Sequence, residues 1–321
     1  MLSAGLLLTA CGSAADDGGS GSGKWSFVDG SGETVEVDHT PERIIAHAGE
    51  AAALMTYGIR PVGIYADEPV DTDPNLEGLD LKGIEILGEE WGKIDVEKAA
   101  GLDPDLIVAD WWPAEKAHSG LEEGVEEASK KLAELAPVVG VSQGESILAL
   151  AQGYEKLAAS LGVNVDDPKL GADKDAFEQA LDRFREAVAV KPGLTALAVS
   201  PADDLLYVAN PKYAPELLDF QEWGLDVVNP DSPDPGFPYW ENLSWENADK
   251  YQPDILLIDS RKFDSSLDQA GKHPTWQRIR AAAQGAFVEW PAFWLHTYGD
   301  YADALDTLAG DIEKADAGVG D

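Results

Sequence analysis

The stretch DVEKAAGLDPDLIVAD at residues 95–110 has a counterpart later in the chain, SWENADKYQPDILLID at residues 244–259. Laid over one another without a gap, the two copies match at five positions, which in the first copy are Glu97, Ala99, Pro104, Asp105 and Asp110. Four apolar residues precede the final aspartate of each copy. Solenoid repeats recur every ~20–50 residues, so this wider separation predicts two lobes that each contain the same helix-turn-strand unit.

The length and composition fit a protein of two domains. The chain has 321 residues, of which 44% are hydrophobic, and domains average roughly 150 residues. After the N-terminus, no uninterrupted apolar run approaches the ~20 residues that span a membrane. The formal net charge of −37 argues against a nucleic-acid partner, because binding to phosphates requires a basic surface.

Residues 1–23 are predicted to be a leader and a flexible tether. The chain starts MLSAGLLLTACGS, so an apolar stretch ends in Leu8-Thr9-Ala10-Cys11, and a Gly/Ser-rich run follows. This pattern resembles a bacterial lipobox, in which signal peptidase cuts before a cysteine that then carries lipid. The basic start of a signal peptide is missing, and the alternative is a disordered tail with a chance cysteine. We expect lipidation at Cys11, which would hold the protein at the outer face of a membrane or in the periplasm.

From Lys24 onward, short apolar runs alternate with helical patterns. Strands are expected at 43–48, 61–66, 106–110, 137–142, 194–200, 206–210, 225–229, 255–259 and 286–290. Helices are expected at 50–58, 96–102, 126–135, 214–224, 244–251 and 275–284. This alternation predicts an α/β protein built from βαβ units around buried parallel sheets.

A long helix is expected between the two lobes. In the segment from Asp173 to Val190, apolar residues recur at i, i+4, i+7 and i+11, which marks one face of an amphipathic helix. We therefore divide the chain into an N-terminal lobe at 24–165, a linking helix at 166–191 and a C-terminal lobe at 192–315. A single connecting helix would act as a stiff spine that permits only small hinge motion.

Four features in a fixed order carry a family resemblance: the phrase at 41–65, the repeated Glu-to-Pro-Asp phrase, the long central helix, and HPTWQRIRAAAQGAFVEW at 273–290. Over residues 24–315 the chain resembles the iron-siderophore and vitamin B12 group of periplasmic binding proteins, the substrate-binding components of ABC importers. The resemblance implies two Rossmann-like lobes joined by one long α-helix, with the ligand in the cleft between them. It further implies a ferric siderophore as ligand, an ABC permease as partner, no cofactor and no catalysis. We expect a monomer.

The residues just after the repeated strands are the first ligand-binding candidates. Ligands of α/β lobes bind at the carboxyl ends of the strands, and the repeated strands end at Asp110 and Asp259. Trp111-Trp112 and Ser260-Arg261 follow them. Aromatic faces opposite a guanidinium suit a bulky, partly apolar ligand that carries oxygen atoms.

Other candidates follow other strands or lie in aromatic-rich loops. A single tryptophan more often packs in a core than contacts a ligand, so packing is the competing interpretation for each aromatic residue. These further candidates are His47, Glu50, Tyr65, Trp91, Tyr207, Phe237, Tyr239, Trp240, Trp294 and Tyr298.

The matched glutamates have a separate predicted role. In the family that the chain resembles, one glutamate per lobe within this phrase docks onto arginines of the permease, and Glu97 and Glu246 occupy those positions. The competing interpretation is that each carboxylate complements a helix dipole, worth about 0.3–1 kcal/mol. Asp95 and Ser244 have suitable chemistry for the two helix N-caps.

Besides the siderophore receptor, a second and a third functional hypothesis remain open. The same fold could bind cobalamin, haem or a free transition-metal ion, but the five histidines at 39, 47, 118, 273 and 296 are dispersed. His47 with Glu50 gives only two ligands near one strand end, so no direct metal site is expected. An enzyme is the third alternative, although the chain has no GxGxxG after a strand, no GxxxxGK[ST] and no GxSxG.

The charge of the chain favours one siderophore class. Catecholate complexes are strongly anionic and call for several basic residues, but Arg261, with Lys262 beside it, is the main cation at a predicted strand end. Hydroxamate complexes are nearly neutral or cationic and suit an acidic, Trp-rich protein better. We therefore expect a hydroxamate ligand.

Overall fold

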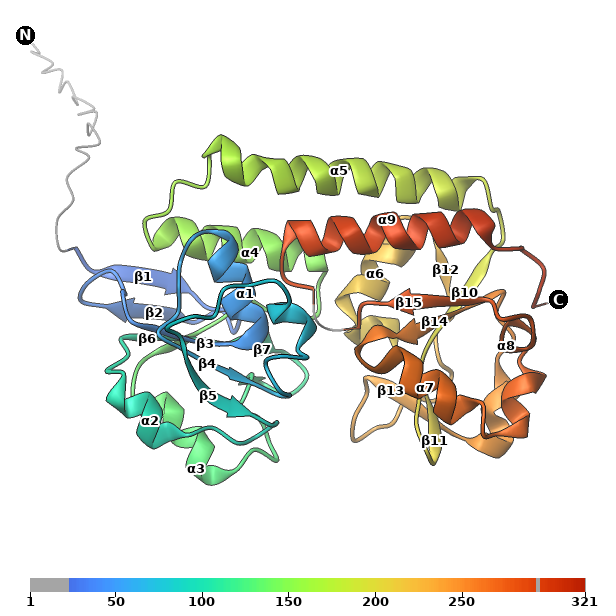
Figure 1. The fold of residues 1–321 in the computed structure, drawn as a ribbon, viewed down its shortest axis with the longest axis horizontal. Coiled ribbons are helices and arrows are strands. Elements are labelled where there is room, and N and C mark those ends of the chain that lie inside the picture. The colour runs from blue at the N-terminus through green and yellow to red at the C-terminus, as the bar shows by residue number, and fades with distance from the viewer. Residues whose placement is uncertain (1–22, 293–294, 321) are drawn as a thin grey trace, which may run out of the picture.

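The computed structural model describes residues 23–292 and 295–320 and shows two α/β halves beneath a layer of helices (Figure 1). Two of the predicted site residues, Cys11 and Trp294, lie outside the described residues. The predicted fold class of two α/β lobes joined by a long helix is confirmed. The two sheets are separate, with no strand pairing between them among the described residues.

The sheet of the first half is entirely parallel, as predicted. Its strand order is β5-β4-β3-β6-β9. The strands are β3 (Ile44–His47), β4 (Gly63–Ala66), β5 (Glu85–Glu89), β6 (Leu106–Val108) and β9 (Val138–Val139). Their connections include the helices α1 (Ala48–Thr56), α2 (Val96–Gly101) and α3 (Glu127–Lys130). β3, β4 and β6 are buried along nearly their whole length, which explains why their sequences are continuous apolar runs.

Two small hairpins flank this sheet and were not expected from the sequence. β1 (Trp25–Val28) pairs with β2 (Thr34–Val37), and β7 (Trp111–Trp112) pairs with β8 (Ala117–His118). The buried Asp29 carboxylate fastens both to the sheet, because it accepts hydrogen bonds from the His118 imidazole at 3.0 Å and the Gly140 amide at 2.8 Å.

The sheet of the second half is mixed, so the expectation of a purely parallel sheet is wrong here. Its order is β13-β11-β10-β14-β15, with β12 also pairing with β10. The strands are β10 (Thr195–Pro201), β11 (Leu205–Ala209), β12 (Asp226–Val227), β13 (Trp240–Ser244), β14 (Ile255–Asp259) and β15 (Phe287–Trp290). Only residues 202–204 separate β10 from β11. That link is too short for a parallel crossover, which takes about a dozen residues, so β11 folds back antiparallel.

Two predicted helices of the second half are shorter and tighter than expected. The segment predicted at 244–251 is a 3₁₀ helix, Trp245–Lys250, and the segment predicted at 275–284 divides into a 3₁₀ helix, Pro274–Arg278, and α8 (Arg280–Gln284). Two further α-helices of this half are α6 (Pro215–Glu222) and α7 (Phe263–Ala270).

Three helices join the halves. α4 (Ile147–Ser160) lies over the first half, α5 (Pro168–Ala189) runs above both, and α9 (Tyr298–Lys314) lies alongside α5 (Figure 1). The predicted apolar face of α5 is buried at Phe177, Leu181 and Phe184. The sequence did not lead us to expect α9, and one continuous core cluster includes residues from α4, α5, α9 and both sheets. The halves are therefore joined by packing as well as by the linking helix.

The repeated phrase forms matching units in the two halves. The aspartate after its proline holds the start of the neighbouring strand: Asp105 accepts the backbone N–H groups of Glu42 and Arg43 at 2.9 and 2.8 Å. In the second half, Asp254 accepts the Thr195 amide at 2.8 Å and the amides of Gly318 and Gly320 at 2.8 and 2.9 Å. The repeated Pro-Asp pair therefore fixes the start of β3 in one half and the start of β10 in the other by hydrogen bonds to the aspartate.

The N-caps of the two units differ. The Asp95 carboxylate caps α2 by accepting the Lys98 amide at 2.9 Å. Ser244 occupies the N-cap position of the 3₁₀ helix but makes no side-chain capping bond there, so that expectation is wrong. Its hydroxyl oxygen instead accepts from the Asn247 side-chain amide at 3.1 Å.

Candidate functional site

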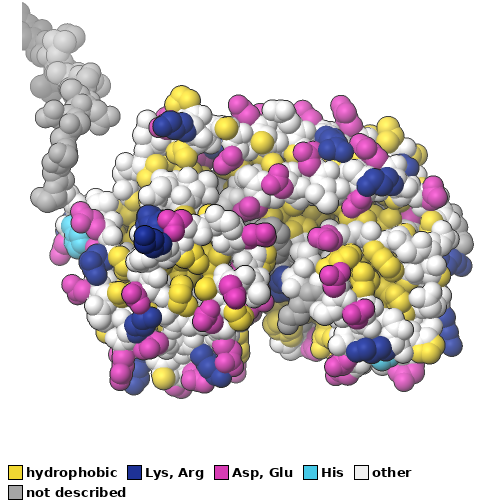
Figure 2. All heavy atoms as spheres, viewed as in Figure 1, with side chains coloured by type: hydrophobic (Ala, Val, Ile, Leu, Met, Phe, Trp, Pro, Cys, Tyr) yellow, Lys and Arg dark blue, Asp and Glu magenta, His cyan; other side chains and the backbone are white. Residues whose placement is uncertain are grey.

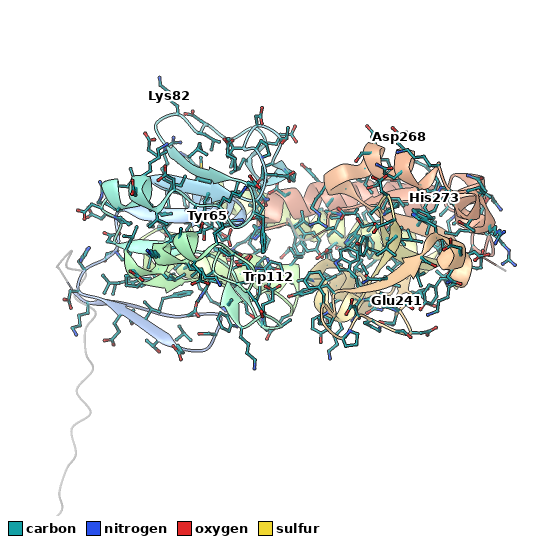
Figure 3. The ribbon with its side chains drawn as sticks, turned by 90° about the horizontal axis from the view of Figure 1, so that it is seen from below. Tyr65, Lys82, Trp112, Glu241, Asp268 and His273 are labelled. Atoms are coloured by element: carbon teal, nitrogen blue, oxygen red, sulfur yellow. The ribbon has the colours of Figure 1, made fainter. Side chains whose placement is uncertain are left out.

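A cavity of about 420 Å³ lies between the two halves. In the space-filling view a hollow separates the halves at the lower edge (Figure 2), and from below Trp112 lies close to the boundary between them (Figure 3). The first half contributes residues at or after the ends of β3, β4, β5, β6 and β9, and the second contributes residues near β13, β14 and β15. The site thus occupies the carboxyl ends of the parallel strands, where ligands of α/β proteins bind.

Eight of the candidates from the sequence line this cavity. They come from both halves and comprise aromatic, basic and acidic side chains. They are His47, Glu50, Trp91, Trp112, Phe237, Tyr239, Trp240 and Arg261.

Ser260, which begins the 3₁₀ helix Ser260–Lys262, does not line it, and neither do four aromatic candidates, each for a structural reason. Successive side chains of a strand point to opposite faces, so in β7 Trp112 faces the cavity while Trp111 packs edge-on against His118 at 5.1 Å between ring centroids. Tyr65 is buried and donates to the Ser119 carbonyl at 2.8 Å. Tyr207 packs against the Trp240 ring.

Tyr298, the fourth of these candidates, begins α9 and lines a separate surface groove between α4 and α5. Its hydroxyl lies 3.4 Å from a Glu155 carboxylate oxygen. The expectation that Tyr298 follows the last strand into the cleft is wrong because the chain enters α9 at that residue.

The aromatic side chains form a wall that spans the two halves. Trp112 of the first half meets Tyr239 of the second edge-on, at 6.2 Å between ring centroids, and Phe237 lies 4.9 Å from Tyr239. The Trp112 indole donates to the Ser119 hydroxyl at 2.9 Å, which fixes its orientation. Phe237 remains half-exposed, so this wall offers apolar area to a ligand.

The rest of the lining is strongly acidic. Burial and the nearby charge of Glu122 raise the pKa of Glu115. Glu122 accepts the Trp91 indole N–H at 2.9 Å. Among the described residues that line the cavity, Arg261 is the only Lys or Arg, and its guanidinium is paired with Asp259 at 2.6 Å. The cavity therefore presents an excess of negative charge.

Ten further residues that line the cavity were not expected from the sequence. Several follow strands whose ends were predicted, so the strand-end rule applied to every strand would have found Asp67 and Glu68 after β4, Gln143 after β9 and His296 after β15. The ten are Asp67, Glu68, Asp73, Pro74, Asn75, Glu115, Ser119, Glu122, Gln143 and His296. Asp110, although recognised as a strand end, was not expected to line the cavity, as it does.

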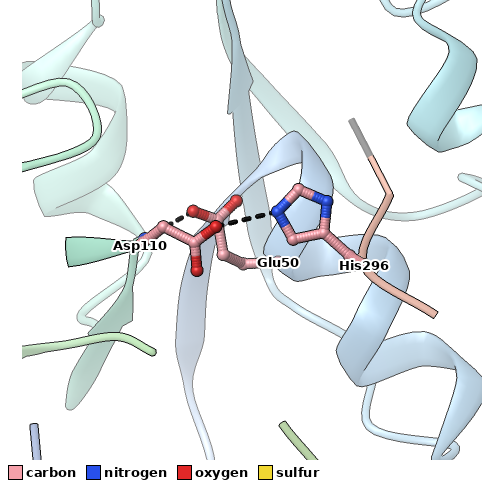
Figure 4. Close-up of side chains that lie close together, drawn as sticks. All are labelled: Glu50, Asp110 and His296. Atoms are coloured by element: carbon pink, nitrogen blue, oxygen red, sulfur yellow. Dashed lines mark hydrogen bonds and ion pairs between the residues drawn. The ribbon is translucent and has the colours of Figure 1, made fainter. Parts of the chain in front are cut away.

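A buried polar network forms the base of the cavity (Figure 4). Glu50, Asp110 and His296 are exposed by 0%, 1% and 6%. Glu50 accepts the backbone N–H of Asp110 at 2.5 Å, and His296 Nε2 lies 2.8 Å from Asp110 Oδ2. Asp110 also accepts from the Gln143 amide at 2.6 Å and from the Tyr154 hydroxyl.

The network shifts the pKa values of its two carboxyl groups, Asp110 and Glu50, in opposite directions. Burial and the charge of Glu50 raise the pKa of Asp110. Burial alone would raise the pKa of Glu50 too, but the charge and hydrogen bond of His47 outweigh it and lower that pKa. Burial disfavours a charged His47, yet the carboxylates of Glu50 and Asp67 hold its pKa well above its ordinary value. At neutral pH the base thus contains an ion pair of His47 with Glu50, at 2.8 Å.

Comparisons with known proteins point in one direction. The sequence profile of a family described as "Periplasmic binding protein" matches residues 66–292. The Fe(3+)-citrate-binding protein YfmC of Bacillus subtilis (strain 168) is 27% identical over 307 residues, covering 89% of this chain and 85% of YfmC. The putative ABC transporter substrate-binding lipoprotein YhfQ of the same organism is 22% identical over 295 residues, covering 87% of this chain and 85% of YhfQ.

A solved structure with a high similarity is that of DesE, a ferric-siderophore receptor protein from Streptomyces coelicolor. It is 33% identical to this chain with a TM-score of 0.80, and the match covers 91% of this chain and 99% of DesE. Within residues 23–292 and 295–320, no helix is both long and apolar enough to cross a membrane.

Proposed function

This chain belongs to the periplasmic binding protein family, and on that premise we propose that it captures a ferric siderophore and delivers it to the permease of an ABC importer. Members of this family are substrate-binding proteins rather than enzymes, and we propose that this chain likewise performs no reaction and carries no cofactor. The two-lobed fold with a cavity between the lobes supports this function, as does the similarity to the siderophore receptor DesE.

One observation carries the ligand class: an aromatic wall shared by both halves faces an acidic lining. Trp112, Phe237 and Tyr239 suit the apolar parts of an organic chelate. Arg261, the one Lys or Arg that the structure describes in the lining, is already paired with Asp259, so strongly anionic complexes such as ferric catecholates meet repulsion. A ferric hydroxamate, neutral or cationic, fits this lining best.

Tryptophan fluorescence provides the test. Protein freed of ligand would be titrated with a ferrioxamine-type chelate, a ferric catecholate, ferric citrate, haem and cobalamin. We expect the ferrioxamine-type chelate to quench fluorescence saturably at the lowest concentration. Tight quenching by haem or cobalamin alone would refute the siderophore function, and a preference for the catecholate would refute the hydroxamate class.

We propose that Glu97 and Glu246 dock the permease. Both side chains are exposed, and each lies in the first turn of the equivalent unit of its half. One anion per lobe allows a partner with two basic patches to contact both lobes at once. A role in complementing the helix dipole is compatible with docking.

The placement of the protein in the cell follows from the same premise. The relative YhfQ is named a lipoprotein, and we propose that Cys11 carries the lipid that tethers this protein, as a monomer, outside the membrane. We further propose that residues 24–165 and 192–315 act as the two lobes and that 166–191 links them.

A further inference from the structure

The buried network at the base of the cavity contains a set of metal-ligating atoms. One carboxylate oxygen each from Glu50 and Asp110 and one imidazole nitrogen of His296 all lie within 4.8 Å of one another. All three side chains are buried, and all three line the cavity. They are therefore shielded from bulk water but can be reached from the cavity.

A fourth group at the same place has an unmet hydrogen-bonding requirement. Gln143 is 2% exposed and lines the cavity. Its side-chain nitrogen donates to Asp110 at 2.6 Å and lies 3.5 Å from His296 Nε2, while its side-chain oxygen has no hydrogen-bond partner. A buried amide oxygen without a partner costs about 1–3 kcal/mol, and an amide oxygen is a metal ligand.

We propose that Glu50, Asp110, His296 and Gln143 form a binding site for a divalent transition-metal ion at the base of the cavity. Two carboxylates, an imidazole and an amide oxygen make a mixed oxygen and nitrogen donor set, which suits Zn²⁺, Fe²⁺ or Mn²⁺ rather than the softer Cu⁺. A bound cation would also offset the repulsion between two buried carboxylates.

The surroundings hold these ligands in place. His47 contacts the outer oxygen of Glu50 at 2.8 Å, and its other ring nitrogen lies 3.5 Å from Asp67. A chain of carboxylate, imidazole and carboxylate of this kind orients a ligand and tunes its basicity. Gly49 allows the His296 ring to approach closely, because a Cβ at that position would overlap the imidazole.

The ligands come from segments that are far apart in the sequence. Glu50 lies in α1, Asp110 follows β6 and Gln143 follows β9, all in the first half, whereas His296 lies between β15 and α9. A metal ion at this position would tie the segment that leads into α9 to the sheet of the first half. Metal binding is therefore expected to stabilise the fold as well as to occupy the site.

Titration of the metal-free protein with Zn²⁺, Mn²⁺ or Co²⁺, in the absence of any siderophore, tests the site. Calorimetry should show one ion bound per chain, and Tm should rise with metal concentration. Bound Co²⁺ should give visible absorption bands that report a nitrogen and oxygen environment. The absence of saturable binding for all three ions would overturn the proposal.

Variants locate the site. Glu50→Gln and His296→Gln should each weaken Zn²⁺ binding by about 100-fold or more, and His47→Gln, which removes an outer partner, by about 10–100-fold. Gln143→Leu removes a proposed ligand without changing charge and should also weaken binding. His118→Gln is the matched control, because His118 pairs with Asp29 outside the cavity lining. It should leave the affinity within about twofold.

Circular dichroism would establish that each variant folds. If Glu50→Gln or His296→Gln does not fold, the uncharged substitution Gln143→Leu provides the test. Unchanged Zn²⁺ affinity in folded Gln143→Leu would overturn the four-ligand site. Since no chelate is present, failure of this proposal leaves the siderophore function untouched. Failure of siderophore binding in the fluorescence titration would likewise leave the metal site standing.

Discussion

Adjacent residues in β7 have different environments because strand side chains alternate between two faces. Trp112 lies in the cavity wall against Tyr239, whereas Trp111 packs on His118 behind it. The backbone of Trp111 pairs with the neighbouring His118 of β8, which fixes this alternation. The two tryptophans therefore form a natural pair in which one tests ligand contact and the other tests packing.

Trp112→Ala should weaken binding of a ferric hydroxamate by about tenfold, the equivalent of about 1.4 kcal/mol, because it removes part of the aromatic wall. Trp111→Ala should leave the Kd within about twofold and lower the free energy of unfolding instead. Calorimetric titration and urea denaturation of both variants would measure the two effects. Equal loss of affinity in the two variants would show that β7 acts as a unit rather than through Trp112.

Each copy of the repeated phrase contains an aspartate directly after its proline, Asp105 in the first half and Asp254 in the second. Each of these carboxylates connects its unit to the start of a neighbouring strand by hydrogen bonds. Burial alone would raise the pKa of Asp254, but backbone hydrogen bonds from Gly320 and Thr195 outweigh it and lower that pKa. The pKa of Asp105 is lowered by the same kind of bonds, from Glu42 and Arg43. Both carboxylates thus stabilise the fold above their unfolded-state pKa near 3.8, and this contribution is lost as the pH falls below that value.

Asp254→Ala should lower the free energy of unfolding by about 2–4 kcal/mol, because three partly buried backbone N–H groups lose a charged acceptor. Asp105→Ala should have a similar but smaller effect, since its carboxylate is more exposed. Asp268→Ala, at an exposed position of α7, is the control and should stay within about 0.5 kcal/mol. Urea denaturation at pH 7 measures the free energy of unfolding of all three variants. Equal losses in Asp254→Ala and Asp268→Ala would contradict the stabilising role of the Asp254 hydrogen bonds.

Asp219 joins three helices. From α6, it accepts the amides of Ile147 and Leu148 at the start of α4, at 2.9 and 3.4 Å, and the Tyr301 hydroxyl of α9 at 2.8 Å. Burial raises its pKa from 3.8 to about 6, although these hydrogen bonds oppose the shift. Because the folded-state pKa is raised, the native state binds this proton more tightly than the unfolded chain does. Stability from this group is present below pH 3.8 and is lost as the pH rises through about 6.

Asp219→Asn should remove the pH-dependent contribution of this carboxyl to the free energy of unfolding, and the amide retains an oxygen that can accept the hydrogen bonds. Between pH 4.5 and pH 7 the wild-type protein should lose about 2 kcal/mol from this group, and the variant should lack that loss. Urea denaturation of both proteins at the two pH values isolates the difference, since other titrating groups are common to both. An identical pH dependence in the two proteins would show that Asp219 does not titrate in this range.

At the scale of the whole molecule, the two halves are fastened by more than the linking helix. The core is continuous from one half through α4, α5 and α9 to the other. Asp219 adds polar contacts where these helices meet, and the pair of His296 with Asp110 adds one at the base of the cavity. This arrangement supports small adjustments of the lobes around a ligand rather than wide opening.

The proposed docking of the permease is a property of the whole molecule, because it needs one glutamate on each lobe. The double variant Glu97→Ala/Glu246→Ala should retain the affinity for ferric chelate and lose uptake of labelled iron in cells. A control variant that alters two exposed glutamates outside the repeated phrase, Glu178→Ala/Glu313→Ala, should transport normally. Loss of chelate affinity in the first variant would count against a docking role.

The two α/β lobes, most strands and the linking helix α5 could be predicted from the amino-acid sequence alone. Local patterns suffice for these elements, because the apolar runs of β3, β6 and β14 and the helical periodicity at Phe177 and Phe184 are signals within a few turns or strand pairs. The similar segments at 95–110 and 244–259 predicted equivalent units in the two halves. The position of Trp112 in the cavity was predicted from the rule that ligands bind at the carboxyl ends of parallel strands.

Which side chains contact one another depends on how the elements pack in three dimensions. The base of the cavity unites Glu50, Asp110, Gln143 and His296, which no local pattern connects, because strand order and the path into α9 place their segments together. The same holds for the antiparallel turn of β11 and for the position of Trp111 behind the wall. Periodicity reports the environment of one element, whereas a binding site depends on neighbours that are distant in the chain, and those neighbours are set by packing.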